Sequence, residues 1–138
     1  LMANFPLAGL LRLRGIELDA AQGRLAGANR RTIENREHRS RIMAGLGTGQ
    51  TRPSDPATLM AVAAARSSAR ADLAALDALI ASSEQEQAEA QAQFREAKMR
   101  TVPLEKMAER HRGEAIAAEL KAEQDALDEA ASQRAASR

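Results

Sequence analysis

One stretch, GLGTGQTRPSDP from Gly45 to Pro56, limits what this chain can fold into more than any other part of the sequence. Its three glycines, two prolines and aspartate cannot continue a helix. The residues on both sides are mostly Ala, Glu, Lys, Arg, Leu and Gln, which favour long helices. We therefore expect two long helices joined by a single turn.

The predicted fold is all-α, a long antiparallel two-helix coiled coil with an overhanging C-terminal helix. Ser54 or Asp55 can cap the second helix, with Pro56 in its first turn. Pro103 lacks a backbone N–H and clashes with the preceding helical turn, so we expect a new helix to begin there. The single predicted coiled-coil domain, residues 1–138, consists of helix one (about 6–44), a loop (45–55), helix two (about 56–100) and the overhang (about 103–131).

A heptad pattern sets the expected packing of the two helices. If partner residue numbers sum to about 101, Leu7 faces Phe94 and Ile42 faces Leu59. Helix one is then used up, and everything from Arg95 onward has no partner helix in this chain. The charges agree with folding back, because residues 1–53 carry nine basic and four acidic residues, whereas residues 54–138 carry eleven and fifteen.

The composition excludes several classes of protein. The chain has two Phe and no Tyr or Trp, so a compact globular core would be thin. It has no cysteine, which removes disulfides and thiolate sites and suits a reducing cytosol. No apolar run approaches the roughly 20 residues of a membrane span. The opening LMANFPLAGLL is too short in its apolar part to predict a signal peptide.

Three short patterns invite chemical interpretations, which the residues do not support. The segment from Ala44 to Thr51 lacks the lysine and the first glycine of a phosphate-binding loop. Glu34 and His38 have the spacing of metal ligands, but a site needs at least one ligand more. A two-helix rod encloses no substrate, so we expect no enzyme activity, no metal and no cofactor. The stretch from Arg30 to Arg41 has five arginines, but its two glutamates argue against nucleic-acid binding.

Two stretches carry a resemblance to a known family. FPLAGLLRLRGIELDAAQGRLAGANR, from Phe5 to Arg30, resembles the N-terminal helix of the FliJ family of flagellar type III export stalk proteins. LEKMAERHRGE, from Leu104 to Glu114, and AELKAEQDALDEAA, from Ala118 to Ala131, look like the C-terminal signature of that family. The family commonly has a basic residue where Val102 stands, and Pro103 is unexpected in the middle of that helix.

The resemblance implies a cytoplasmic stalk, peripheral at the inner face of the cell membrane. In this family the end with the termini inserts into the hexameric ring of the export ATPase. The opposite end contacts the cytoplasmic part of the export gate protein, and export chaperones are further partners. The resemblance places six residues at the ATPase end: Leu104, Glu105, Arg110, Glu119, Lys121 and Asp128. For the gate end, the weaker candidates are Arg30, Arg31, Arg36 and Arg41.

Two alternatives remain open from the sequence. A generic coiled-coil scaffold or tether would have the same composition and the same heptads. A basic-helix protein associated with nucleic acid would use arginines 30–41, and its affinity would fall steeply with salt.

Overall fold

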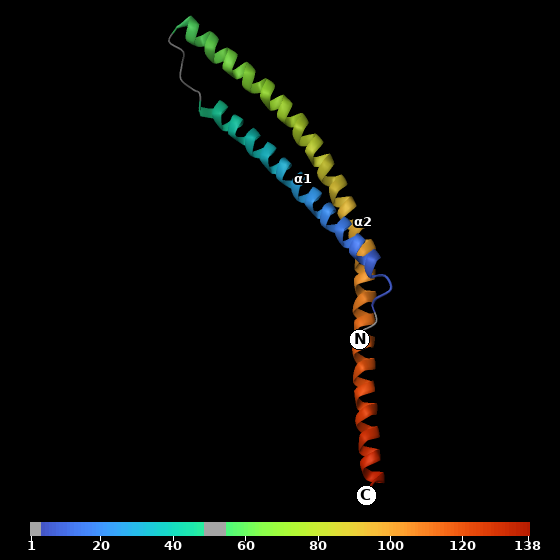
Figure 1. The fold of residues 1–138 in the computed structure, drawn as a ribbon. Coiled ribbons are helices and arrows are strands. Elements are labelled where there is room, and N and C mark those ends of the chain that lie inside the picture. The colour runs from blue at the N-terminus through green and yellow to red at the C-terminus, as the bar shows by residue number, and fades with distance from the viewer. Residues whose placement is uncertain (1–3, 49–54) are drawn as a thin grey trace. The chain divides into compact units, whose positions relative to one another are not determined.

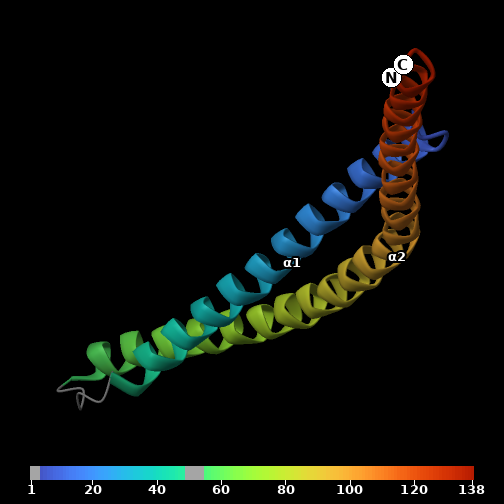
Figure 2. The ribbon, with the colours of Figure 1, turned by 90° about the horizontal axis from the view of Figure 1, so that it is seen from below.

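The computed structural model describes residues 4–48 and 55–138, and within them it contains two helices and no strand. Helix α1 runs from Ala8 to Thr48 and helix α2 from Pro56 to Ala136. Figures 1 and 2 show the two helices lying side by side over the length of α1. The all-α prediction with two packed helices is therefore confirmed, and the arrangement fits a coiled coil.

The turn between the helices is shorter than predicted. Helix α1 ends at Thr48, four residues beyond the expected end, and includes Gly45 and Gly47. Neither glycine has a positive φ, so both continue the helix instead of breaking it. The rest of the predicted loop falls on residues 49–54, which lie outside the described residues.

Asp55 caps the start of α2, as one of the two sequence predictions had it. Its Oδ1 accepts a hydrogen bond of 2.6 Å from the backbone N–H of Thr58. Hydrogen bonds from the side chain and the backbone of Thr58 hold the pKa of this carboxyl below its ordinary value of 3.8. The other candidate, Ser54, lies outside the described residues.

The predicted break at Pro103 is wrong, because α2 runs through this proline without interruption. Proline removes the hydrogen bond to the carbonyl of Met99, four residues earlier. The neighbours of Pro103 compensate, since Thr101 and Leu104 are both buried while the proline ring lies on the exposed side. Packing of the buried side thus holds a helix that propensity alone would interrupt.

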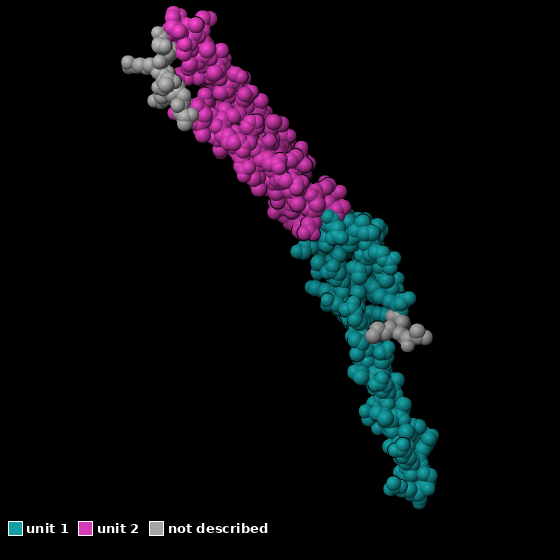
Figure 3. All heavy atoms as spheres, turned by 60° about the vertical axis from the view of Figure 1, so that its left-hand side comes forward, with its two compact units in different colours: residues 1–19, 96–138 teal, residues 20–95 magenta. Residues whose placement is uncertain are grey.

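The chain divides into two compact units, coloured separately in Figure 3. The core of unit 2, residues 20–95, is narrow, because small side chains such as Ala21, Ala28 and Ala90 make up most of it. Two buried hydroxyls interrupt this core. Thr32 donates to the carbonyl of Ala28 and Ser83 to that of Ile80, so each is satisfied within its own helix.

Unit 1 comprises residues 1–19 and 96–138. Its buried residues are Thr101 and Leu104, both on α2. The hydroxyl of Thr101 lies 2.8 Å from the carbonyl oxygen of Ala97 and 3.2 Å from that of Arg14 on α1. Its single proton is therefore shared between its own helix and the neighbouring one.

The predicted register is wrong by two heptads. Contacting residues are Arg14 with Thr101, Asn29 with Gln87, and Arg39 with Asp77, whose numbers sum to 115 or 116 rather than 101. Leu7 does not face Phe94, because its neighbour Phe5 contacts His111 instead. A slip of fourteen residues returns every heptad position to the seam, so the apolar pattern alone does not distinguish the two registers.

Helix α1 contains six of the glycines, whereas α2 contains only Gly113. A methyl group built on five of these six would meet nothing within 4 Å, and only Gly27 has side-chain neighbours. Glycine inside a helix costs about 1 kcal/mol relative to alanine. Packing therefore does not require most of these glycines, and they make α1 the weaker helix. The six positions are Gly9, Gly15, Gly23, Gly27, Gly45 and Gly47.

Candidate partner-binding surfaces

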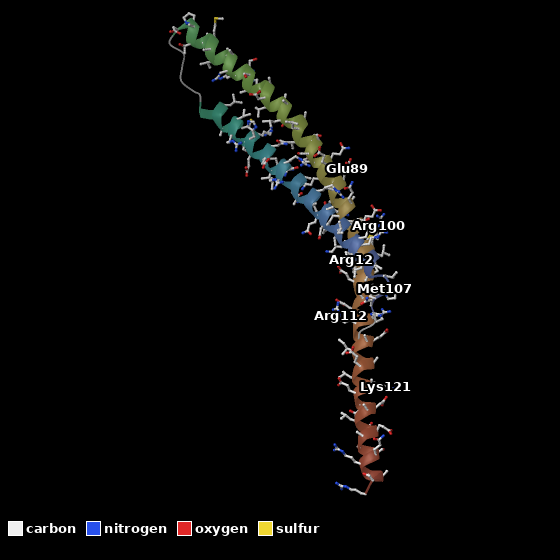
Figure 4. The ribbon with its side chains drawn as sticks, viewed as in Figure 1. Arg12, Glu89, Arg100, Met107, Arg112 and Lys121 are labelled. Carbon is white, nitrogen blue, oxygen red and sulfur yellow. The ribbon has the colours of Figure 1, made fainter. Side chains whose placement is uncertain are left out.

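The C-terminal tail, defined here as residues 116–138, consists entirely of exposed residues. Ile116, Leu120 and Leu127 are spaced by four and seven residues, which places them along one face of the helix. In Figure 4 the side chain of Lys121 projects from this part of α2. An apolar stripe that covers nothing within the described chain is a candidate surface for another protein.

The residues predicted for the ATPase end do not share one exposed patch. Glu119, Lys121 and Asp128 are exposed on the tail, where Asp128 accepts a hydrogen bond of 3.0 Å from Gln124. Glu105 and Arg110 are exposed on the stretch of α2 that belongs to unit 1 with the start of α1. Leu104 is only 9% exposed, so it has little surface to offer to a partner.

Phe5 and His111 form a contact that the sequence analysis missed. Their ring centroids lie 5.6 Å apart, with the ring planes tilted by 54°. Both side chains are half-buried. The heptad pattern could have predicted this contact. The spacing of Ala97 and Thr101 continues past the proline at positions 104, 108, 111 and 115.

Two of the four arginines predicted for the gate end form ion pairs with carboxylates on α2. Arg31 pairs with Glu86 at 3.1 Å, and Arg36 pairs with Glu84. Arg39, which was not among the candidates, pairs with Asp77 at 2.7 Å. Arg30 and Arg41 are exposed and have no ion pair with any described residue. The unlike charges predicted to draw the helices together therefore do meet across unit 2.

A second surface lies near the turn in unit 2, and we call it the hairpin-end groove. Its volume is about 340 Å³. Small residues leave it open, because neither Gly45 on α1 nor Ala65 and Ala69 on α2 can fill the space beside Leu46. The groove is lined by Ile42, Gly45, Leu46, Val62, Ala65, Arg66 and Ala69.

The described residues form neither a cluster of metal ligands nor a membrane-spanning helix. Within 4–48 and 55–138, no three His, Cys, Asp or Glu side chains come together as a metal site would require. Glu34 and His38 thus have no third ligand in that part of the chain. None of the described helices combines the length and the apolar character that crossing a bilayer demands.

Comparison with known proteins gives one positive finding. The model of the protein family described as flagellar FliJ protein matches residues 2–138. The searches of curated proteins and of solved structures returned no match to this chain.

Proposed function

We propose, from the premise that this chain belongs to the FliJ family and so has a role in flagellar export, that it acts as a stalk between two other components of the export apparatus. The family is a non-catalytic component of export, and the proposed role is accordingly mechanical and regulatory. One end of the stalk engages the hexameric export ATPase and stimulates it. The other end engages the cytoplasmic part of the export gate, at the inner face of the membrane.

The observation that carries this proposal is the exposure of the C-terminal tail. Helix α2 continues to Ala136, yet every residue after Ala115 is exposed. Exposure of leucines to water is unfavourable in free energy. Exposed leucines at helical spacing are typical of a surface that docks into another protein. The proposed overhang that enters the ATPase ring is thus residues 116–138, instead of everything after Arg95.

The ring-facing residues are proposed to be those exposed near this end. Glu119, Lys121 and Asp128 lie on the overhang itself, and Glu105 and Arg110 lie before it. Leu104 is proposed to have a structural role at this end instead, because it is buried and so holds α2 in place.

At the gate end, the proposed contacts are Arg30 and Arg41, which keep their full charge available. Arg31 and Arg36 already have carboxylate partners on α2, so a gate protein would have to displace Glu86 or Glu84 to reach them. Export chaperones remain proposed partners, without residues assigned to them.

The test is an ATPase assay of the flagellar export ATPase from the same cell, with the full chain and with a chain that ends at Ala115. The cut after Ala115 leaves the packed residues 97–111 intact, whereas a cut at 104 would remove Leu104 and His111 from their contacts. We expect stimulation by the full chain and none by the shortened one. No stimulation by the full chain would contradict the stalk function and favour a generic tether. Equal stimulation by the two chains would contradict the assignment of the ATPase-binding end to residues 116–138.

A further inference from the structure

We infer that the C-terminal tail of one copy of this protein binds the hairpin-end groove of a second copy. The inference goes beyond the flagellar role and does not depend on it. The two surfaces match in three respects, which are apolar shape, charge and length.

The tail presents its apolar side chains to solvent. Ile116 is 42% exposed, Leu120 61% and Leu127 65%. At 100° per residue these three positions lie within about 40° of one another around the helix axis. Glu123 lies between Leu120 and Leu127 along the sequence and about 20° outside this sector around the axis. The binding face of the tail is therefore apolar with one carboxylate at its edge.

The hairpin-end groove has the complementary composition. Six of its seven lining residues are apolar or glycine, and the seventh is Arg66. Arg66 is exposed and has no ion pair within the described part of the chain. An apolar groove with one free guanidinium is suited to a helix that carries one carboxylate among leucines.

The wider charges agree with this match. The residues around the groove, 38–48 and 55–76, contain four arginines and two aspartates. Helix α1 has no carboxylate after Glu37, so Arg66 lacks a counter-charge of the kind that Glu86, Glu84 and Asp77 provide. Those three carboxylates pair with Arg31, Arg36 and Arg39. The tail segment 116–131 contains five acidic residues and one lysine. Opposite net charges steer the two surfaces together and raise the association rate.

The lengths agree as well. From Leu120 to Leu127 the tail spans seven residues, and from Val62 to Ala69 the wall of the groove also spans seven. At 1.5 Å per residue each corresponds to roughly 10 Å. Leu120 and Leu127 can thus occupy the two ends of the groove while Glu123 reaches Arg66.

A contact between two different surfaces is heterologous, so copies add head to tail. The experiment is sedimentation equilibrium of the full chain over micromolar to millimolar concentrations at low salt. We expect the average mass to rise with concentration, and the association to weaken as salt is raised, because exposed charges are screened. A monomeric mass at every concentration would overturn the inference.

Charge reversals identify the surfaces. Glu123→Arg and Arg66→Glu should each weaken association by roughly tenfold, since a favourable pair becomes a repulsive one. The double variant R66E/E123R should recover most of the loss. Asp125→Arg is the matched control, because it changes the net charge as Glu123→Arg does but lies on the opposite face of the helix, and it should associate like the parent.

Circular dichroism of each variant checks that the chains are folded. All three substituted positions are exposed, so none of the changes should alter helix content. Association that is insensitive to Arg66→Glu would mean that the tail pairs with another tail or another face. That result would overturn the assignment of the groove. Failure of the double variant to recover would overturn the pairing of Arg66 with Glu123.

Discussion

The hydroxyl of Thr101 lies 3.2 Å from the backbone carbonyl oxygen of Arg14, a residue 87 positions earlier in the chain. Thr101 is almost fully buried, and its hydroxyl also lies 2.8 Å from the carbonyl of Ala97. A small polar side chain at this position lets the two backbones approach closely. It also ties α2 to α1 within unit 1, because the hydroxyl reaches an acceptor on each helix.

Replacing Thr101 by valine should test the worth of that contact. Valine keeps the shape but loses the donor, so we expect a loss of about 0.5–1.5 kcal/mol in the free energy of unfolding. Thr101→Ser keeps the donor and removes a methyl group, and it provides the comparison. Chemical denaturation followed by circular dichroism measures both. A valine variant as stable as the parent would show that the hydrogen bonds of this hydroxyl contribute nothing net.

Phe5→Ala should release the beginning of the chain from α2. The ring loses its contact with His111, a kind of pair worth about 0.5–1.5 kcal/mol beyond its buried area. Amide hydrogen exchange should become faster in the first turns of α1, near Ala8, and stay unchanged in unit 2. His111→Ala should produce the same local effect, and discordant results for the two variants would contradict a shared contact.

Pro103→Ala should stabilise the chain. The helix already runs through this position, and the proline ring lies on the exposed side, so alanine restores a backbone hydrogen bond without disturbing buried residues. We expect a gain of about 1–3 kcal/mol in the free energy of unfolding, given a proline cost of about 3 kcal/mol in a helix interior. Met99→Ala, on the same exposed side, should change stability little. A destabilised alanine variant would mean that the packing of unit 1 requires the proline.

The cap at Asp55 should give stability that depends on pH. Its folded pKa lies below the ordinary value of 3.8, so its contribution is present above pH 3.8 and is lost as the pH falls through the lowered pKa. Asp55→Asn retains a capping oxygen without the charge. In this variant the stability of the first turn of α2 should not change with pH in that acid range. Asp55→Ala removes the capping oxygen and should weaken the start of α2 at neutral pH as well. Site-resolved NMR at Thr58 distinguishes the three chains.

The ion pairs of unit 2 should matter more for register than for stability. Arg39 and Asp77 are each about half exposed, at 42% and 57%, so the pair should contribute less than about 1 kcal/mol. Asp77→Arg should be destabilising by more than Asp77→Asn, because it opposes two cations. Adding Arg39→Glu to Asp77→Arg should recover the difference in thermal unfolding at low salt, and this recovery should fade at high salt.

The heptad positions could be read from the sequence, but their alignment could not. In α1, the heptad positions from Leu11 to Leu46, taken at alternating spacings of three and four residues, are all buried or half-buried. Apolar residues at a constant period are equally well buried after a slip of fourteen residues, so they cannot decide between alignments. The polar cross-helix pairs decide, and a choice such as Asn29 with Gln87 is visible only once the helices are packed.

The interruption at Pro103 was overestimated for a related reason. Helix propensity describes an isolated segment, whereas burial of Thr101 and Leu104 on the other side of the same turn favours continuation. The sequence analysis also left everything from Arg95 onward without a partner helix, so His111 was not expected to contact Phe5. The tail residues were identified through family resemblance, and their role stays a prediction.

The unequal distribution of glycine between the two helices has a consequence for how the chain is made. Residues 8–48 form a segment with six helical glycines, too weak to hold a helix unaided. During synthesis, Arg14 obtains its contact with α2 only once Thr101 has been added to the chain. The two helices therefore pack against each other late, after the residues near Thr101 have left the ribosome.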